Sequence, residues 1–270
     1  LTAMAQYDNQ SFHRGHFTSF FFLNPDPAEN RRLASIKFRE DVLGIPRAKH
    51  SINDTGALDE FVDWGHQQMD GIGVYLYTYF HAANLGLIDL KELDRELTNQ
   101  NLENGADSLF SVALHFLHEI DYANNADLGP WEKEMGWKRA SSVGLCLAAF
   151  KEAKKYFDDR NWDTEKTITV NPNVNLKKII EESIASGTTT INERIPSDGR
   201  PAIETDEIPC DSALVFLLLF NPGLNEVQEG KIIERLMKNM GEHGTRRMDN
   251  QLDTFMGQNY ALNPNGFGQW

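Results

Sequence analysis

Two segments of the sequence concentrate residues that can do chemistry. The first, Asp63–Gly71, holds an indole, an imidazole, two amides and two carboxylates directly before an apolar stretch. A tryptophan ring offers an apolar surface to the C–H groups of a sugar, while Asp, Gln and His make directed hydrogen bonds to hydroxyls. The segment therefore indicates a sugar-binding loop in which Trp64, Gln67 and Asp70 contact the ligand. A structural interpretation is equally supported, in which Asp70 caps the next helix and Trp64 fills the core.

The second segment, Asn124–Glu134, places Trp131 beside Glu132 after a Gly-Pro turn. A carboxyl group held against an aromatic ring loses hydration, and its pKa rises toward the range where it can protonate a glycosidic oxygen. Glu132 is therefore the candidate general acid. Lys133 acts in the opposite direction, because a nearby ammonium group favours the ionised carboxylate. The alternative is a surface Glu-Lys-Glu run that lies beside a buried Trp131.

Helical periodicity dominates the chain, and helices must position these two segments. Apolar residues recur at helical spacing over Gly71–Leu85, Leu109–Ile120 and Val143–Phe157, the last opened by Ser141 and Ser142. Shorter helices are predicted over Pro27–Glu40, Leu90–Leu102, Asn175–Ala185, Ala213–Phe220 and Glu226–Met240.

Long loops separate the predicted helices, at Gly44–Gly65, Asn124–Arg139 and Gly187–Asp206. Strand signals are few, and the β-branched runs Thr167–Val170 and Thr188–Ile191 predict a short hairpin at most. The alternation of helices and loops predicts one all-α domain over residues 1–270, built of stacked helical hairpins with its variable loops on one rim.

Composition restricts the partners of the chain. Its 26 basic and 40 acidic residues give a net charge of −14, which would repel a nucleic acid. No stretch approaches the roughly 18 apolar residues of a membrane span, so we expect neither a nucleic acid nor a membrane as partner. The chain begins at Leu1 without an initiator Met, which favours a trimmed product or a fragment.

The sequence shows no pattern of a cofactor or metal site. Cys146 and Cys210 have neither the number of a disulfide framework nor the spacing of a zinc site, so we expect two buried thiols in a reducing compartment such as the cytoplasm. His115 and His118 lie among apolar residues, and Asp249–Asp253 lacks the spacing of a calcium loop. We therefore expect no metal and no other cofactor.

The two chemical segments resemble the glucoamylase-like proteins of glycoside hydrolase family 15, which include the toroidal domains of phosphorylase kinase regulatory subunits. The resemblance rests on segments that occur in the same order, namely Trp64–Asp70, Asp127–Glu132, Ala140–Gly144, Pro209–Leu214, and Gly244–Arg247 with Asp253–Phe255. It implies an (α/α)6 toroid of helical hairpins, with the active cleft formed by the loops of one rim.

The same resemblance implies roles for individual residues. Asp70 corresponds to the acid that holds the terminal glucose, Trp131 to a sugar platform, and Glu132 to the general acid. Arg246 or Arg247 corresponds to an arginine near the sugar. Oligosaccharides or α-glucans are the implied substrates.

Three features depart from the family pattern. Lys133 stands where the hydrolases have a second carboxylate, no residue aligns with their general base, and the predicted helices are fewer than a closed toroid has. We therefore expect a ring that is open, closed by irregular segments, or incomplete at its C-terminal end. An inverting glycosidase needs two carboxyl groups about 6.5–9.5 Å apart, and the sequence identifies only Glu132.

Three functional hypotheses follow from these observations. The leading one is an inverting, exo-acting α-glucoside hydrolase with Glu132 as general acid. The second is a noncatalytic carbohydrate-binding or regulatory toroid that lacks the base. The third is a helical interaction scaffold in which both loops are merely structural.

Overall fold

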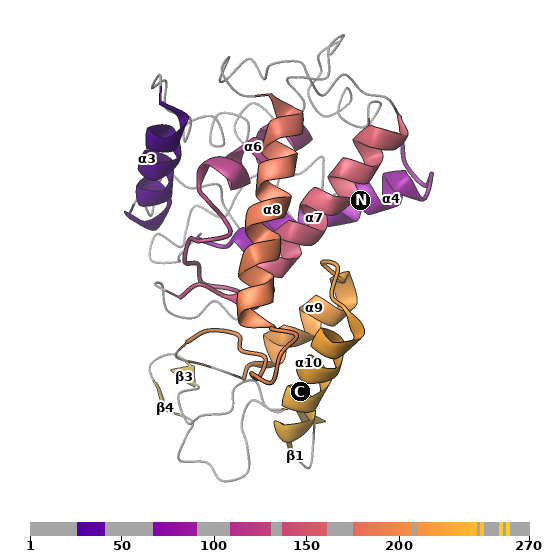
Figure 1. Cartoon of the computed structure of the whole chain (residues 1–270). Coiled ribbons are helices and arrows are strands. Elements are labelled where there is room, and N and C mark those ends of the chain that lie inside the picture. The colour runs from indigo at the N-terminus through magenta and orange to yellow at the C-terminus, as the bar shows by residue number, and fades with distance from the viewer. Residues whose placement is uncertain are drawn as a thin grey trace.

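The computed structural model describes residues 26–40, 67–90, 109–130, 137–160, 175–206, 208 and 210–241, with three strand segments beyond them. Most of these residues are helical (Figure 1). The helices are α3 (Pro27–Glu40), α4 (Met69–Asn84), α6 (Leu109–Glu119), α7 (Ala140–Asp159), α8 (Leu176–Arg194), the 3-10 turn η1 (Ser212–Leu214), α9 (Val215–Phe220) and α10 (Glu226–Lys238). The predicted all-α class is confirmed.

Strands contribute little to this fold. β1 (Met240–Gly241) pairs antiparallel with β2 (Gly244–Thr245), and β3 (Thr254–Phe255) pairs antiparallel with β4 (Gln258–Asn259). Within the described ranges, none of the helices has the length and apolar character that a membrane crossing requires. Cys146 and Cys210 are both buried thiols that form no disulfide, as predicted.

The helices form two rows that alternate along the chain. α7 packs against α4 and α9 in one row, and α6 packs against α3 and α8 in the other. α7 also packs along α8, so the two rows share one core. The labelled ribbons in Figure 1 show α7 behind α8, with α9 and α10 below them.

α4 and α7 run in the same direction. The Cys146 thiol, in the second turn of α7, donates to Met69 O at the start of α4, with an Sγ–O distance of 3.3 Å. At the other end, Asn84 Nδ2 donates to Glu152 O at 3.0 Å. The two helices therefore begin at one end of the molecule.

α9 continues this direction, and α8 runs against it. Leu217 of α9 lies against Gly144 near the start of α7, and Pro222 O, just after α9, accepts from Lys151 Nζ further along α7, so α9 begins at the same end. In α8 the order is reversed, because Ile191 lies near Gly144 while the earlier Gly187 lies near Leu147. The helices of the first row are thus parallel to one another and antiparallel to α8.

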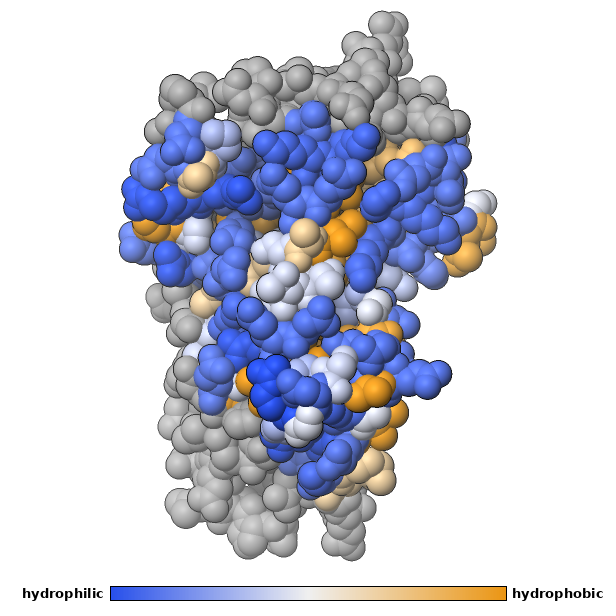
Figure 2. Space-filling view, viewed as in Figure 1, coloured by the Kyte–Doolittle hydropathy of each residue, from blue (hydrophilic) through white to orange (hydrophobic). Residues whose placement is uncertain are grey.

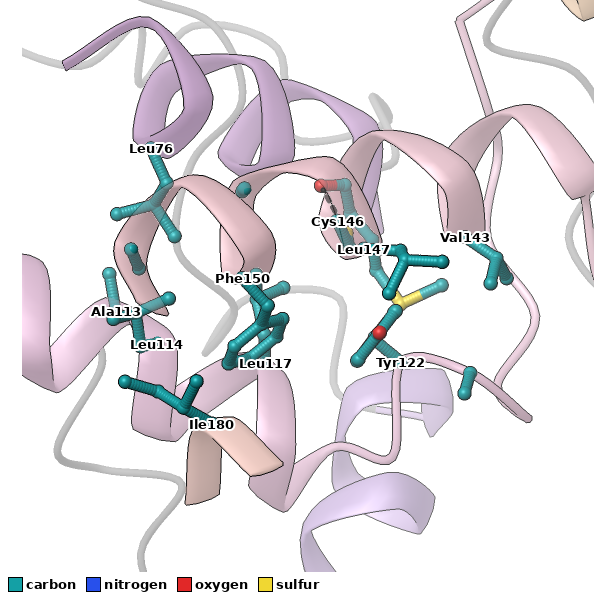
Figure 3. Close-up of a cluster of buried hydrophobic side chains, with 14 of the residues drawn as sticks. Leu76, Ala113, Leu114, Leu117, Tyr122, Val143, Cys146, Leu147, Phe150 and Ile180 are labelled. Carbon is teal, nitrogen blue, oxygen red and sulfur yellow. Dashed lines mark hydrogen bonds between the residues drawn. The ribbon is translucent and has the colours of Figure 1, made fainter. Parts of the chain in front are cut away.

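The hydrophobic core lies between the two rows, with α7 at its centre (Figure 3). Nearly every residue of the first three turns of α7 is buried. Side chains from four helices meet there, among them Leu76, Leu114, Leu117, Leu147, Phe150 and Ile180. A helix that is buried on nearly all sides is held in place by its neighbours. α7 is therefore the central helix against which α4, α8 and α9 pack.

α8 corrects two predictions. The sequence predicts a helix that ends at Ala185, followed by a loop in which Thr188–Ile191 forms at most one side of a short hairpin, but the helix continues to Arg194. Asn175 caps its start by accepting a hydrogen bond from Lys178 N–H at 2.8 Å. Packing of Gly187 and Ile191 against α7 and its neighbours outweighs the β propensity of the threonines, which is weak and context-dependent.

The start of α7 also differs from the prediction. Ser141 and Ser142 were expected to open it, but the helix begins at Ala140 and both serines lie inside its first turn. The preceding residue, Arg139, makes no side-chain cap. Beyond Leu90, the predicted helix 90–102 lies outside the described residues, as does the run Thr167–Val170.

One face of the molecule is largely hydrophilic, with apolar patches where α9 and α10 lie (Figure 2). α10 buries Gln228 and Ile232, whereas Ile233 and Met237 are exposed. The helix therefore covers α9 with one face and presents an apolar stripe on the other.

Glycine sets the closest approach of α4 to α7, and this can be tested. A Cβ atom at Gly73 would lie 2.8 Å from Cys146 N and 2.9 Å from Leu145 C, both backbone atoms. Because backbone cannot move as a side-chain tip can, Gly73→Ala should lower the free energy of unfolding by about 1–3 kcal/mol in urea titrations.

The matched control is Gly71→Ala in the same helix, where nothing lies within 4 Å of the added Cβ. This variant should raise the free energy of unfolding by up to about 1 kcal/mol, since alanine favours the helix. Equal effects of the two substitutions would contradict the described packing.

Candidate functional site

The two loops singled out in the sequence meet at the start of α4. Met69 N–H donates to Asp127 Oδ2 at 3.2 Å, and Leu128 N–H donates to Gln67 O at 2.8 Å. Asp127 thus accepts from a free N–H of the first turn of α4, a task that an N-cap side chain usually performs. The segment before α4 and the segment that leads to Trp131 and Glu132 are therefore joined by two hydrogen bonds.

Several polar atoms at this junction are buried without a partner. Gln67 is only 1% exposed, and neither its Nε2 nor its Oε1 has a hydrogen-bond partner in the described part of the chain. The same holds for Gln68 Nε2 and for Asp70 Oδ1. Asp70 itself reaches the surface in part, while this one oxygen is buried. An unsatisfied buried polar group costs about 1–3 kcal/mol, so a ligand rich in hydroxyls would gain by satisfying several of them.

Arg139, one of the largest fully buried side chains, occupies the centre of the junction. Its Nε donates to Asp127 O at 3.5 Å, and its guanidinium lies 5.2 Å from the ring centroid of Trp137. Gly129 has a φ of +66°, and a Cβ there would lie 2.2 Å from Arg139 Cδ. Glycine at this position therefore provides both the left-handed turn and the space for the arginine.

Carboxyl groups satisfy the start of α7, from the distant residue Glu204, and the start of η1, from its own N-cap residue Asp211. Glu204 accepts hydrogen bonds from the Ser141 N–H at 3.0 Å and from the Ser141 hydroxyl, and its backbone O accepts from Ala140 N–H at 2.9 Å. Asp211 Oδ1 accepts from Ala213 N–H at 2.8 Å. Helix N-termini carry positive partial charge, so these acids lie where that charge favours them.

The carboxyl groups nevertheless retain their protons to unusually high pH. Burial raises the pKa of Asp70 to about 7, and the charge of Asp127 adds to the effect. Burial raises the pKa of Asp127 to about 6, against the opposing effect of Arg139. Burial also raises the pKa of Glu204 to about 8, with Asp211 contributing. One guanidinium thus fails to offset the cost of burying several carboxylates.

The structure brings together some of the residues that the sequence predicted for the site. Gln67 and Asp70 lie at the junction, next to the loop that leads to Pro130. The predicted residues Trp64, Trp131, Glu132, Arg246 and Arg247 lie outside the described residues, as does Lys133.

Sequence reasoning missed Arg139 and Glu204. Arg139 directly precedes the Ala140–Gly144 segment, so its place before a helix start was a usable signal. Glu204 lies in a loop of mixed composition, and no local pattern distinguishes it from the other acids there.

The histidine pair of α6 has structural partners. His115 Nε2 lies 3.1 Å from Glu119 Oε1, and His118 Nδ1 lies 3.1 Å from Ser183 Oγ. In the part of the chain that is described, no three His, Cys, Asp or Glu side chains are grouped so as to hold a metal ion.

Comparison with known proteins gives no assignment, because neither a family model nor a curated protein matches the chain.

The raised pKa of Glu204 makes stability depend on pH. The folded protein keeps this proton up to about pH 8, whereas the unfolded chain releases it near 4.5, so the free energy of unfolding falls as pH rises through this interval. For each proton that only the folded protein retains, the free energy of unfolding falls by about 1.4 kcal/mol per pH unit. Glu204→Gln, which cannot ionise, should remove roughly 3 kcal/mol of the decline between pH 5 and 7.5 in urea unfolding.

Glu234→Gln serves as the control, since Glu234 is an exposed acid paired with Lys238. Its substitution should leave the pH dependence above pH 5 unchanged. A Glu204→Gln variant that loses stability as steeply as the wild type would show that Glu204 does not carry the proton.

Proposed function

We propose that the chain is a glucoamylase-like domain that binds the terminal glucose of an oligosaccharide or α-glucan where α4 and α7 begin. The unpartnered, buried amide of Gln67 supports this proposal most directly, together with Asp70 beside it. A sugar hydroxyl can donate to one atom and accept from another, so one glucose can satisfy an amide and a carboxylate at once. In this proposal, Asp70, predicted from the family resemblance, and Gln67, predicted from the residue types of its loop, hold the sugar together.

We further propose that the helices are part of an (α/α)6 toroid. Its support is the alternation of rows, with α4, α7 and α9 parallel in one and antiparallel α8 in the other. In a toroid of hairpins, the inner helices all begin at the same rim. The buried acids at the starts of α4, α7 and η1 lie on that rim in this arrangement.

In the proposed reaction, Glu132 donates a proton to the leaving glycosidic oxygen while a water molecule attacks the anomeric carbon from the opposite face. Asp70 and Gln67 hold the terminal glucose. Arg246 or Arg247 and the rings of Trp64 and Trp131 would complete the sugar contacts. A second carboxylate must remove a proton from the water, and the sequence does not identify it.

A noncatalytic carbohydrate-binding or regulatory domain is the second candidate, and one observation favours it. Asp127, Glu204 and Asp211 all accept hydrogen bonds from backbone N–H groups at helix starts. Within the described residues of this junction, these three acids act as caps, and a capping carboxylate is poorly placed to activate water. Such a domain would keep the sugar contacts and release no glucose.

Maltotriose separates the two candidates. Calorimetry should show one binding site, and a glucose assay should show release if the domain is catalytic. Glu132→Gln should then lower the release rate about 10²–10⁴-fold with little change in affinity, because it removes only the proton donor. Binding without any release by the wild type would select the noncatalytic candidate.

Asp70→Asn should weaken maltotriose binding about tenfold or more, since a hydrogen bond to a charged group contributes about 1.5–3 kcal/mol. Asp158→Asn is the control, because Asp158 lies near the opposite end of α7 and is exposed. Full affinity in Asp70→Asn, or no binding by the wild type, would contradict the proposed site.

A further inference from the structure

Asp70 does not stand alone at the start of α4. The carboxylate of Asp127 accepts from Met69 N–H, one residue before Asp70 in the chain. Arg139 donates to the backbone of Asp127 and fills the space above Gly129. Asp127 and Arg139 therefore lie together beside the helix turn that carries Asp70, and the charges of both act on the Asp70 carboxyl group.

We infer that Asp127 and Arg139 are positioning residues that together set the charge on Asp70 and thereby couple glucoside binding to pH. The inference rests on the proposed function, and it adds a form of regulation that the sugar contacts alone do not require.

The two residues act on Asp70 with opposite sign. The negative charge of Asp127 favours the protonated form of Asp70, whereas the guanidinium of Arg139 favours the ionised form. The Cys146 thiol faces the pair from α7, but burial and both acids raise its pKa, so it stays neutral. Asp127, Arg139 and Cys146 are the titratable groups that act on Asp70 or respond to it in the described part of the chain.

The charge on Asp70 matters for the ligand. An ionised carboxylate accepts hydrogen bonds from sugar hydroxyls more strongly than a protonated carboxyl group does. Because Asp70 changes its charge at about pH 7, affinity should rise with pH through this value. A small change in the opposing electrostatic effects of Asp127 and Arg139 on Asp70 would then alter the affinity for the glucoside at constant pH.

The experiment measures two pH profiles from 5 to 9 for each protein. One is the affinity for maltotriose by calorimetry, and the other is the Asp70 carboxyl signal in ¹³C NMR, identified by its loss in Asp70→Asn. Asp127→Asn should lower the midpoint of both profiles by about one pH unit, and Arg139→Met should raise it by a similar amount. Near neutral pH, such shifts change the affinity several-fold, up to about tenfold.

Matched variants separate this role from a merely structural one. Arg194→Met removes another buried arginine, which pairs with Asp206, and Asp211→Asn alters another buried capping acid. Both should leave the Asp70 midpoint unchanged, although they lower stability. Arg139→Lys keeps the charge and should restore most of the wild-type midpoint.

The possible results lead to different conclusions. Midpoints that do not move in Asp127→Asn, which keeps an oxygen to cap α4, would overturn the inference even if Arg139→Met failed to fold. Shifts of the same sign in the two variants would also overturn it. If the NMR midpoint moves as expected but maltotriose does not bind at any pH, the proposed function fails while the control of the Asp70 charge stands.

Discussion

Three parallel helix starts at one end of the molecule impose the constraint on which the rest of the structure depends. α4, α7 and the η1–α9 segment each begin with backbone N–H groups that have no partner within the helix. Asp127 and Glu204 come from distant loops and supply acceptors to α4 and α7, while Asp211 caps η1 from the position directly before it. These acids are buried, so Arg139 must be buried with them to supply positive charge. The same few residues therefore fill the space at the helix starts, accept their backbone hydrogen bonds and balance part of the buried charge.

This arrangement leaves buried acids that are protonated near neutral pH and, among the described residues, polar atoms that have no hydrogen-bond partner. Asp70, Asp127 and Glu204 keep protons to near-neutral pH, because burial raises their pKa values. Side-chain atoms of Gln67, Gln68 and Asp70 have no hydrogen-bond partner in the described structure. A fold optimised for stability alone would have replaced them with apolar side chains. Polar atoms that remain unsatisfied beside a helix start are well suited to hydroxyl groups, which both donate and accept. The proposed glucose site is the simplest function that uses them.

Much of the fold could be predicted from the sequence, because the apolar residues of α3, α4, α6 and α7 recur at helical spacing and the structure has helices at these positions. The prediction failed at the C-terminal half of α8, where Gly187 and Ile191 pack on α7 and override the local β signal at Thr188–Ile191. Gln67 and Asp70 could be proposed as site residues from their types before an apolar helix, and that assignment stays a prediction. Arg139 and Glu204 were not proposed, since their roles arise from contacts between segments distant in the chain, which no local pattern encodes.

A crystal structure of the chain with maltotriose would test the central claim most directly. The account predicts that the terminal glucose lies at the start of α4, with hydroxyl groups within hydrogen-bond distance of the Gln67 amide and of Asp70 Oδ1. A saturated crystal in which the sugar occupies another surface, with the Gln67 amide in contact only with protein atoms, would contradict it.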